Sequence, residues 1–364
     1  MQVSLRINRL IVMLAAVFGA AAMSASVGNY RFTHITSRDG LPYQQVQALA
    51  NDERGQLWIG TRNGLSVYDG YEMLNYYSEA GNRHSLTHNF VDALHCDGKG
   101  RMWVGSYGGI CVYCPETDDF RRYEMPDRQV SSIVENSSGQ IVCGGTDLYI
   151  YDEKEDKFEP LPHQDLGFII SLAFDRDDRL FVATNKSIYY FDKSFSKATQ
   201  IKKEYFDDFI TGVDGIIPMF FDSNGLLWIG RNGKGVMSID MASDDVKVWS
   251  GSELSDGTVR VISEDSGHNI WLGTEKGVTI IKPDGTISVL QQNYIDKNEL
   301  NDNAVYDILC DKNGNVWIGT YFGGINALLR SNEQFKWIEP GYDSSTLRGK
   351  AVREIIEPRS GVLW

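Results

Sequence analysis

The chain has 364 residues, of which 42% are hydrophobic, 12% aromatic and 23% charged, with 36 glycines and 9 prolines. This composition can bury a large core, so it excludes disordered and collagen-like structure, and the length allows one large or two ordinary domains. Lysine and arginine number 35 against 49 aspartates and glutamates, and the resulting net charge of −14 excludes nucleic acid and anionic membrane surfaces as partners of this segment.

Residues 1–25 differ from everything after them. Two arginines precede the apolar run Leu10–Phe18, which is followed by small residues up to Ala25. The apolar run is short for a membrane span, and small residues before Ser26 suit a signal peptidase. The sequence therefore predicts a signal peptide at residues 1–25, with an uncleaved N-terminal anchor as the alternative, and places the rest of the chain outside the cytoplasmic membrane.

An internal repeat covers the remainder of the chain. The phrase apolar-Trp-apolar-Gly, usually followed by Thr or Ser, returns at a nearly constant interval. Full copies centre on Trp58, Trp103, Trp228, Trp271 and Trp317, two copies carry Val142 and Phe181 in the tryptophan position, and an eighth copy ends at Trp364. Seven steps over the 306 residues from 58 to 364 give close to 44 residues each, the period of four-stranded propeller blades.

The positions that precede each tryptophan define two strands and a turn. Apolar residues stand twelve and nine positions before it, as at Val46 and Leu49, and predict an inner strand A. An Asp or Asn stands six positions before it in seven of the copies, and a Gly stands three before it in most, as at Asp52 and Gly55. This pair is typical of a tight turn capped by the Asx side chain, which leads into strand B with its tryptophan.

Each repeat then continues through a second tight turn at a glycine into strand C, as in Leu65–Tyr68, and a variable strand D, as in Tyr71–Tyr77. One such sheet cannot bury both of its faces alone, whereas seven stacked around an axis can. The prediction is an all-β protein: a seven-bladed β-propeller of four-stranded antiparallel blades, followed by the start of a further blade. The five tryptophans are expected to be structural, buried between blades.

Ring closure follows from the first strand. Tyr30–Thr36 reads as a strand D with no A, B or C before it, so we expect it to complete the seventh blade. The predicted domains are residues 26–340 as the propeller and residues 341–364 as the start of an eighth repeat belonging to a second propeller.

Motifs for catalysis or for a cofactor are not found, and no metal site is predicted. His84 and His88 share a loop but supply only two ligands, and Asp222–Gly225 recurs at the turn position, where turn capping explains it better than calcium. The five cysteines include Cys111 and Cys114, which fall on opposite faces of one strand and are not expected to form a disulfide.

The phrases Asp39-Gly40-Leu41-Pro42 and Asp52-x-x-Gly55-x-Leu57-Trp58-Ile59-Gly60-Thr61, with their seven counterparts, resemble the two-component regulator propeller repeat. The third and fourth repeats depart from it in lacking tryptophan. The resemblance implies the N-terminal periplasmic sensor part of a hybrid two-component system of Bacteroidetes. In such proteins further propeller, membrane, histidine kinase and DNA-binding parts follow, and the signal is commonly an oligosaccharide. It also implies a homodimer, anchored in the inner membrane through downstream regions.

Ligand contacts are expected where the repeat varies. B–C turns and D–A connections emerge on one face of the ring, because strand direction alternates. Aromatic rings stack on sugars, and Arg and Asn bind hydroxyl groups. The candidate ligand-binding residues on this face are Arg62, Tyr107, Arg231, Asn232, Tyr321 and Phe322.

Three functions remain open. The first is a non-enzymatic sensor that detects an oligosaccharide and controls a histidine kinase and the transcription of glycan-use genes. The second is a free-standing lyase-like propeller enzyme, which needs a histidine and a carboxylate converging on the central channel. The third is a protein-interaction scaffold.

Overall fold

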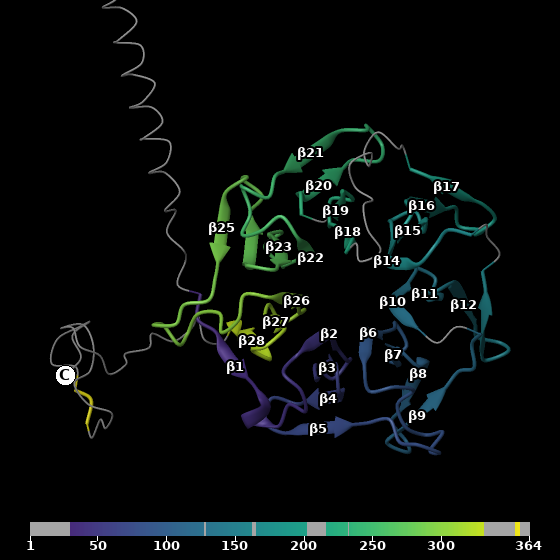
Figure 1. The fold of residues 1–364 in the computed structure, drawn as a ribbon, viewed down its shortest axis with the longest axis horizontal. Coiled ribbons are helices and arrows are strands. Elements are labelled where there is room, and N and C mark those ends of the chain that lie inside the picture. The colour runs from purple at the N-terminus through teal and green to yellow at the C-terminus, as the bar shows by residue number, and fades with distance from the viewer. Residues whose placement is uncertain are drawn as a thin grey trace, which may run out of the picture. The chain divides into compact units, whose positions relative to one another are not determined.

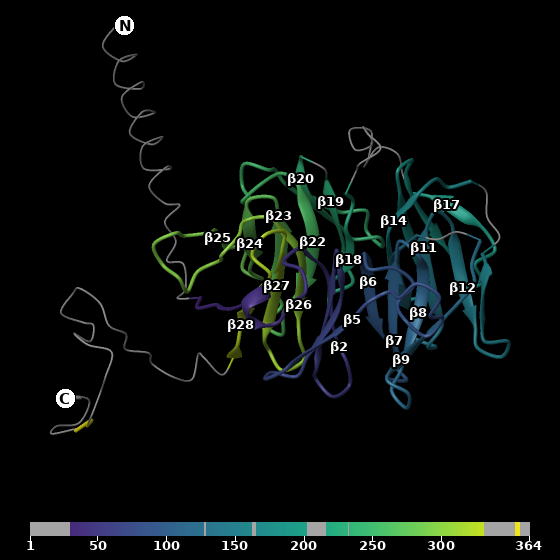
Figure 2. The same ribbon diagram turned by 60° about the horizontal axis from the view of Figure 1, so that its bottom comes forward.

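The computed structural model describes residues 30–126, 129–161, 165–201, 216–231, 233–330 and 354–356. In this part of the chain, seven four-stranded antiparallel sheets stand around a common axis with their first strands innermost (Figures 1 and 2). The predicted seven-bladed all-β propeller is thereby confirmed. The predicted signal peptide, and all of residues 341–364 except 354–356, lie outside the described residues.

Six blades run from the inner strand outward in chain order. Blade 1 contains β2 (Val46–Asn51), β3 (Leu57–Thr61), β4 (Gly64–Tyr68) and β5 (Met73–Tyr76). Blade 2 contains β6 (Val91–Cys96), β7 (Met102–Ser106), β8 (Gly109–Cys114) and β9 (Asp119–Arg122). Blade 3 contains β10 (Val130–Glu135), β11 (Ile141–Gly145), β12 (Leu148–Asp152) and β13 (Lys157–Pro160).

The next three blades repeat this order. Blade 4 contains β14 (Ile169–Phe174), β15 (Leu180–Thr184), β16 (Ile188–Phe191) and β17 (Ala198–Gln200). Blade 5 contains β18 (Met219–Phe221), β19 (Leu227–Arg231), β20 (Gly235–Ile239) and β21 (Val246–Trp249). Blade 6 contains β22 (Val259–Glu264), β23 (Ile270–Thr274), β24 (Gly277–Ile281) and β25 (Ile287–Leu290).

Blade 7 joins the two ends of the ring. It contains β26 (Val305–Cys310), β27 (Val316–Thr320) and β28 (Ile325–Leu328), and its outer strand is β1 (Thr33–Ile35), which pairs antiparallel with β28. The short 3-10 helix η2 (Ser37–Asp39) follows β1 and is capped by Thr36. Closure by the predicted N-terminal strand is confirmed.

The turn aspartate does more than the predicted capping in the five blades that carry tryptophan. One oxygen of Asp97 accepts the backbone N–H groups of Lys99 and Arg101, and the other accepts the indole N–H of Trp103 at 2.8 Å. The same indole bond, between 2.7 and 3.2 Å, recurs in all five blades that carry tryptophan. Although burial acts to raise it, hydrogen bonds from Trp103 and Arg101 hold the pKa of Asp97 below its ordinary value.

The tryptophans are buried between blades, as predicted. Trp271, for example, lies in one apolar cluster with Ile280 of its own blade and with Val305 and Ile318 of blade 7. The exposed fractions of the five side chains are 3% for Trp58, 0% for Trp103, 5% for Trp228, 2% for Trp271 and 9% for Trp317. In blade 4, Phe181 replaces tryptophan. There the Arg179 Nε donates a hydrogen bond of 2.6 Å to the Asp175 oxygen whose counterpart binds the indole in the blades that carry tryptophan.

A bulge near the start of the inner strand brings neighbouring blades into close contact. The register of β2 against β3 shifts between Val46 and Ala48, and five other inner strands shift at the same position. The extra residue turns Val46 and Leu49 toward the same neighbour, Gly319 of blade 7, where a Cβ would lie 2.5 Å from Val46 Cγ1. The glycine two residues after the tryptophan is thus needed for blade packing.

Side chains on the inner strands also link one blade to the next. In blades 3 and 4, Ser132 and Ser171 accept the backbone N–H of the following inner strand, from Leu172 and Met219. At the ring closure the equivalent residue is Asp307, which accepts the N–H of Leu49 at 2.6 Å. Burial raises the pKa of Asp307 to about 7, although hydrogen bonds from Leu49 and Ile308 oppose this.

All five cysteines lie in the described part of the chain, and all are free. Cys111 is buried and Cys114 is half-buried on the same strand, β8, so the expectation that they form no disulfide is confirmed. Among the described residues, no helix is long and apolar enough to cross a membrane.

We predict that Trp271→Ala lowers the free energy of unfolding by about 3–5 kcal/mol, because it opens a cavity between blades 6 and 7. Trp271→Phe keeps much of the ring and loses only the bond to Asp265, so it should cost less. Urea unfolding measures both. A loss below about 1 kcal/mol for the alanine variant would contradict the packing role.

Deletion of residues 30–36 is expected to leave blade 7 with three strands and an unpaired edge, and so to lower the melting temperature sharply. Circular dichroism and size-exclusion chromatography measure the effect. An unchanged melting temperature would show that another segment closes the ring.

The raised pKa of Asp307 predicts that the stability of the fold depends on pH. Its folded pKa of about 7 exceeds the usual unfolded value of about 4, so the folded state holds the proton over that window. Stability therefore falls as the pH rises from 5 to 7, by up to about 1.4 kcal/mol per pH unit. Asp307→Ser, which copies blades 3 and 4, should show a flatter profile in urea unfolding. Identical profiles would refute this assignment.

Candidate functional site

The two faces of the propeller differ in what they present. One face carries the A–B and C–D turns. The other, here called the loop face, carries the B–C turns and the D–A connections, as the strand order requires. Four of the predicted ligand residues, Arg62, Tyr107, Tyr321 and Phe322, follow β3, β7 and β27 on the loop face. Arg231 ends β19 in blade 5, and Asn232 lies outside the described residues.

Arg62 and Tyr107 are brought together by a residue that the sequence analysis did not select. The Phe90 ring stacks on Tyr107, with centroids 4.4 Å apart and ring planes 8° from parallel. The Arg62 guanidinium lies over the Phe90 ring, 5.4 Å from its centroid. Blades 1 and 2 thus share one cation and two stacked rings on the loop face.

A second cluster joins blades 6 and 7. The Arg260 guanidinium lies 4.2 Å from the Tyr306 ring centroid and forms an ion pair with Glu275. Tyr306 contacts Tyr321 at 5.2 Å between centroids, and Tyr321 in turn contacts Phe322 at 4.4 Å. The two predicted residues of blade 7 are therefore extended by Arg260 and Tyr306, which were missed.

The two clusters lie within electrostatic reach of each other. Burial raises the pKa of the Tyr306 phenol, and the charges that act on it include Arg260, Glu275 and, from blade 1, Arg62. Blades 7, 1 and 2 are neighbours in the ring (Figure 1), so Arg62, Tyr107 and Tyr321 lie on the same face of adjacent blades. Arg231 ends β19 and so belongs to blade 5, not to these three blades.

The missed residues share one structural origin. Arg260 and Tyr306 are the extra residues of the inner-strand bulges, and the equivalent residues in blades 1 and 2 are Gln47 and Asp92. Bulges re-aim side chains and occur often beside binding sites. Burial raises the pKa of Asp92 to about 6, with a hydrogen bond from Gln129 opposing. Among the described residues, the buried Gln47 Nε2 finds no hydrogen-bond partner.

Exposed aromatic side chains concentrate over the same three blades. Four of them belong to loop-face segments of blades 7, 1 and 2: Tyr43 with 45% of its surface exposed, Tyr77 with 41%, Tyr107 with 44% and Phe322 with 70%. Contiguous exposed apolar rings are a feature of binding surfaces, so this part of the loop face is a candidate site.

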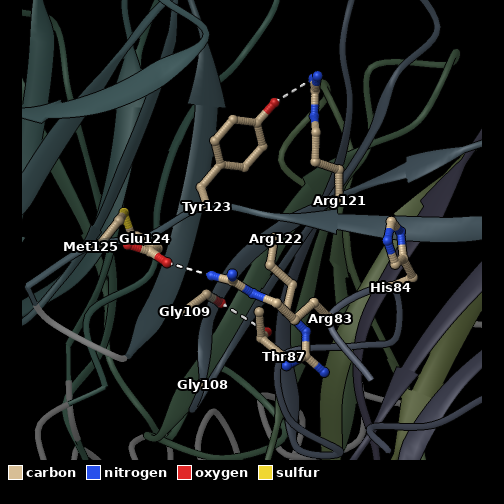
Figure 3. Close-up of a pocket in the computed structure, with 10 residues that line it drawn as sticks. All are labelled: Arg83, His84, Thr87, Gly108, Gly109, Arg121, Arg122, Tyr123, Glu124 and Met125. Atoms are coloured by element: carbon tan, nitrogen blue, oxygen red, sulfur yellow. Dashed lines mark hydrogen bonds and ion pairs between the residues drawn. The ribbon is translucent and has the colours of Figure 1, made fainter. Parts of the chain in front are cut away.

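A hollow of about 610 Å³ opens at the outer edge of the loop face on blade 2 (Figure 3). It is here called the rim hollow. Its walls come from the D–A connection that enters blade 2, from the B–C turn of that blade, and from β9 and the residues after it. They comprise Arg83, His84, Thr87, Gly108, Gly109, Arg121, Arg122, Tyr123, Glu124 and Met125.

A larger hollow of about 910 Å³ lies on the opposite face, between the turns of blades 1 and 2. Its polar groups are engaged in holding those turns. Tyr76 and Tyr113 both donate to Asp118, and Asp52 holds its own turn and Trp58. This hollow is therefore explained by the blade structure.

The histidine and carboxylate required by the enzyme alternative do occur on inner strands. His95 Nε2 lies 3.5 Å from Glu135 Oε2. Glu135, however, accepts the N–H of Gly98 from the neighbouring turn with both oxygens, and Glu264 holds Ser223 in the same way. The pair thus repeats a link between blades. Within the described ranges, no group of three or more His, Cys, Asp or Glu side chains is placed to hold a metal ion.

Comparisons with solved structures match the fold. The extracellular domain of the hybrid two-component system BT3049 from B. thetaiotaomicron has a TM-score of 0.71 at 19% identity, covering 92% of this chain and 46% of that one. That of BT4673 gives a TM-score of 0.67 at 19% identity, over 82% and 40%. Virginiamycin B lyase from Staphylococcus aureus gives 0.61 at 14% identity, over 82% and 97%.

Sequence comparison finds a relative and matches the repeat to a family model. Histidine kinase P4 of Formosa agariphila is 39% identical over 59 residues, which are 16% of this chain and 4% of that protein. This chain thus spans only a small part of the kinase and less than half of the two extracellular domains. The model of the two component regulator propeller family matches residues 40–63, 85–108 and 299–322. Three segments of this chain, in blades 1, 2 and 7, thus carry the two component regulator propeller repeat.

Proposed function

We propose that this propeller is the ligand-sensing module of a hybrid two-component signalling protein, and that it binds an oligosaccharide on the loop face over blades 7, 1 and 2. The module acts outside the cytoplasmic membrane, in the periplasm, and has no catalytic activity of its own. Binding controls a histidine kinase supplied by other parts of the protein, and through it the transcription of glycan-use genes.

The surface of stacked rings and guanidinium groups carries this proposal. Phe90 and Tyr107 form one aromatic platform, and Tyr306, Tyr321 and Phe322 form another. Aromatic faces suit the apolar faces of sugar rings, while Arg62 and its neighbours supply donors for hydroxyl groups. The similarity to extracellular domains of hybrid two-component systems supports the signalling role.

The position of this surface suits signal transmission. It extends over blade 7, in which β1 and β28 bring the two ends of the propeller together. A ligand that contacts blades 7 and 1 at once favours one arrangement of this junction over another. We propose that this preference shifts an equilibrium between two arrangements of a homodimer.

We predict that the double variant Tyr107→Ala/Tyr321→Ala weakens oligosaccharide binding about tenfold, equivalent to about 1.4 kcal/mol. Calorimetry of the purified protein against a panel of defined neutral and acidic oligosaccharides measures this. The free energy of unfolding should fall by no more than about 1 kcal/mol, since Tyr107 is exposed and Tyr321 is only half-buried.

Tyr71→Ala is the matched control, because Tyr71 is 90% exposed in the C–D turn of blade 1 on the opposite face. It should leave the affinity unchanged. Equal affinities for the double variant and the parent would exclude the loop-face aromatic surface as the site. Turnover of any oligosaccharide would favour the enzyme alternative.

A further inference from the structure

The rim hollow gathers positive charge on a strongly acidic chain. Three arginines, Arg83, Arg121 and Arg122, line it together with His84 (Figure 3), whereas the net charge of the chain is −14. Two of the arginines have carboxylate partners: Arg121 binds Asp156 at 2.6 Å, and Arg83 binds Glu124 at 2.5 Å. Arg122 differs from both.

Arg122 is half-buried and is held by neutral groups. Its Nε donates to the Ser85 carbonyl at 2.7 Å, and its Nη2 donates to the Ser85 hydroxyl at 2.8 Å and to the Leu86 carbonyl at 2.5 Å. No carboxylate among the described residues pairs with it. Among the described residues, only neutral oxygens contact this half-buried guanidinium, and a positive charge in such a place favours an anion beside it.

The repeat shows that this charge is not needed to hold the connection. Arg122 occupies the strand D position that Asn75 has in blade 1 and Gln200 has in blade 4. Asn75 ties the D–A connection entering its own blade by donating to the Gly40 carbonyl at 2.9 Å. An uncharged amide thus makes the same kind of tie, so the cation in blade 2 serves another purpose.

The remaining walls leave room for a ligand. The Arg83–Glu124 pair reaches across the hollow in Figure 3, and its side chains are 81% and 88% exposed. Such exposed pairs contribute little and exchange easily. A Cβ on Gly109 would meet no atom within 4 Å, so the turn leaves open space there. A volume of about 610 Å³ falls in the usual range for small-molecule sites.

We propose that the rim hollow binds the anionic group of an acidic oligosaccharide, a uronate carboxylate or a sulfate ester, on Arg122. Arg83 exchanges Glu124 for the ligand. The proposal rests on the proposed function, because the connection that holds Ser85 and Leu86 continues directly to Phe90 in the aromatic platform. One extended chain of sugars then contacts both places, and the rim hollow selects for charge.

Calorimetry on the purified protein tests this with three probes: an oligosaccharide of hexuronic acid, a sulfated oligosaccharide, and a neutral hexose oligosaccharide of the same length. At least one acidic probe should bind at least tenfold more tightly than the neutral one, and its affinity should fall with added salt. The better acidic probe identifies the group. Inorganic sulfate alone is a fourth arm, and sulfate that binds as tightly as the sugars would overturn the requirement for a saccharide.

Arg122→Gln places the uncharged amide of blade 4 at this position, so it removes the charge and keeps an N–H donor near the connection. It should weaken the acidic probe at least tenfold and leave any neutral binding unchanged. Glu124→Gln frees Arg83 and should tighten the acidic probe severalfold, a gain that damage to folding would not produce. Arg54→Gln, an exposed arginine on the opposite face, is the control and should change neither.

The outcomes separate the two proposals. If acidic and neutral probes bind alike and Arg122→Gln changes nothing, the rim hollow is overturned while the sensor proposal stands. If the acidic probe depends on Arg122 but not on Tyr107 and Tyr321, the hollow is supported and the aromatic surface is not the site. If no oligosaccharide binds, both proposals fail.

Discussion

Five of the seven blades depend on one carboxylate with two separate tasks. One oxygen of the turn aspartate fixes the A–B turn by accepting two backbone N–H groups, and the other fixes the tryptophan between blades by accepting its indole N–H. Since a buried indole N–H without a partner is costly, the turn and the packing are stable only together. The bond therefore couples local chain reversal to contact between blades, and five of the seven blades use it.

Hydrogen bonds between neighbouring inner strands also hold the ring together. Serines at one bulge-adjacent position bind the next inner strand in blades 3 and 4, and Asp307 does so where blade 7 meets blade 1. The same bulge adds one residue near the loop-face end of six inner strands. Ring stability and the proposed ligand surface thus share one structural cause, and the bulged residue varies between repeats because the flanking residues carry the packing.

Much of the fold could be predicted because each position of the repeat occurs several times in the chain. The residues at one such position, aligned between repeats, are here called a column. The turns, the tryptophan packing and the closing strand all followed from columns. The Asp265–Trp271 bond was not predicted, because two regular columns six residues apart carry no sign that their side chains touch.

Of the candidate site, Arg62, Tyr107 and Tyr321 were selected because the repeat varies at their positions in the turn. Arg260 and Tyr306 were missed because a regular alternation of inward and outward side chains does not allow for an extra residue. The buried columns of strand A are three residues apart, as at Val46 and Leu49, and this odd spacing was the available signal. The rim hollow requires contacts between a connection and strand D that no column records.

The pairing of β1 with β28 has a consequence for folding. Thr33 pairs with Ala327, so β1 finds its partner only after the strands of the intervening blades have been synthesised. Contacts between residues so far apart in the sequence form late, because the intervening chain loses conformational entropy before the strand pairing can stabilise it. Blades 1–6 form from strands that are consecutive in the sequence, whereas blade 7 also needs β1. Until β1 pairs with β28, the outer edge of β28 is open to any extended segment. The last step of folding is therefore also the step at which two copies of the chain could exchange their N-terminal strands.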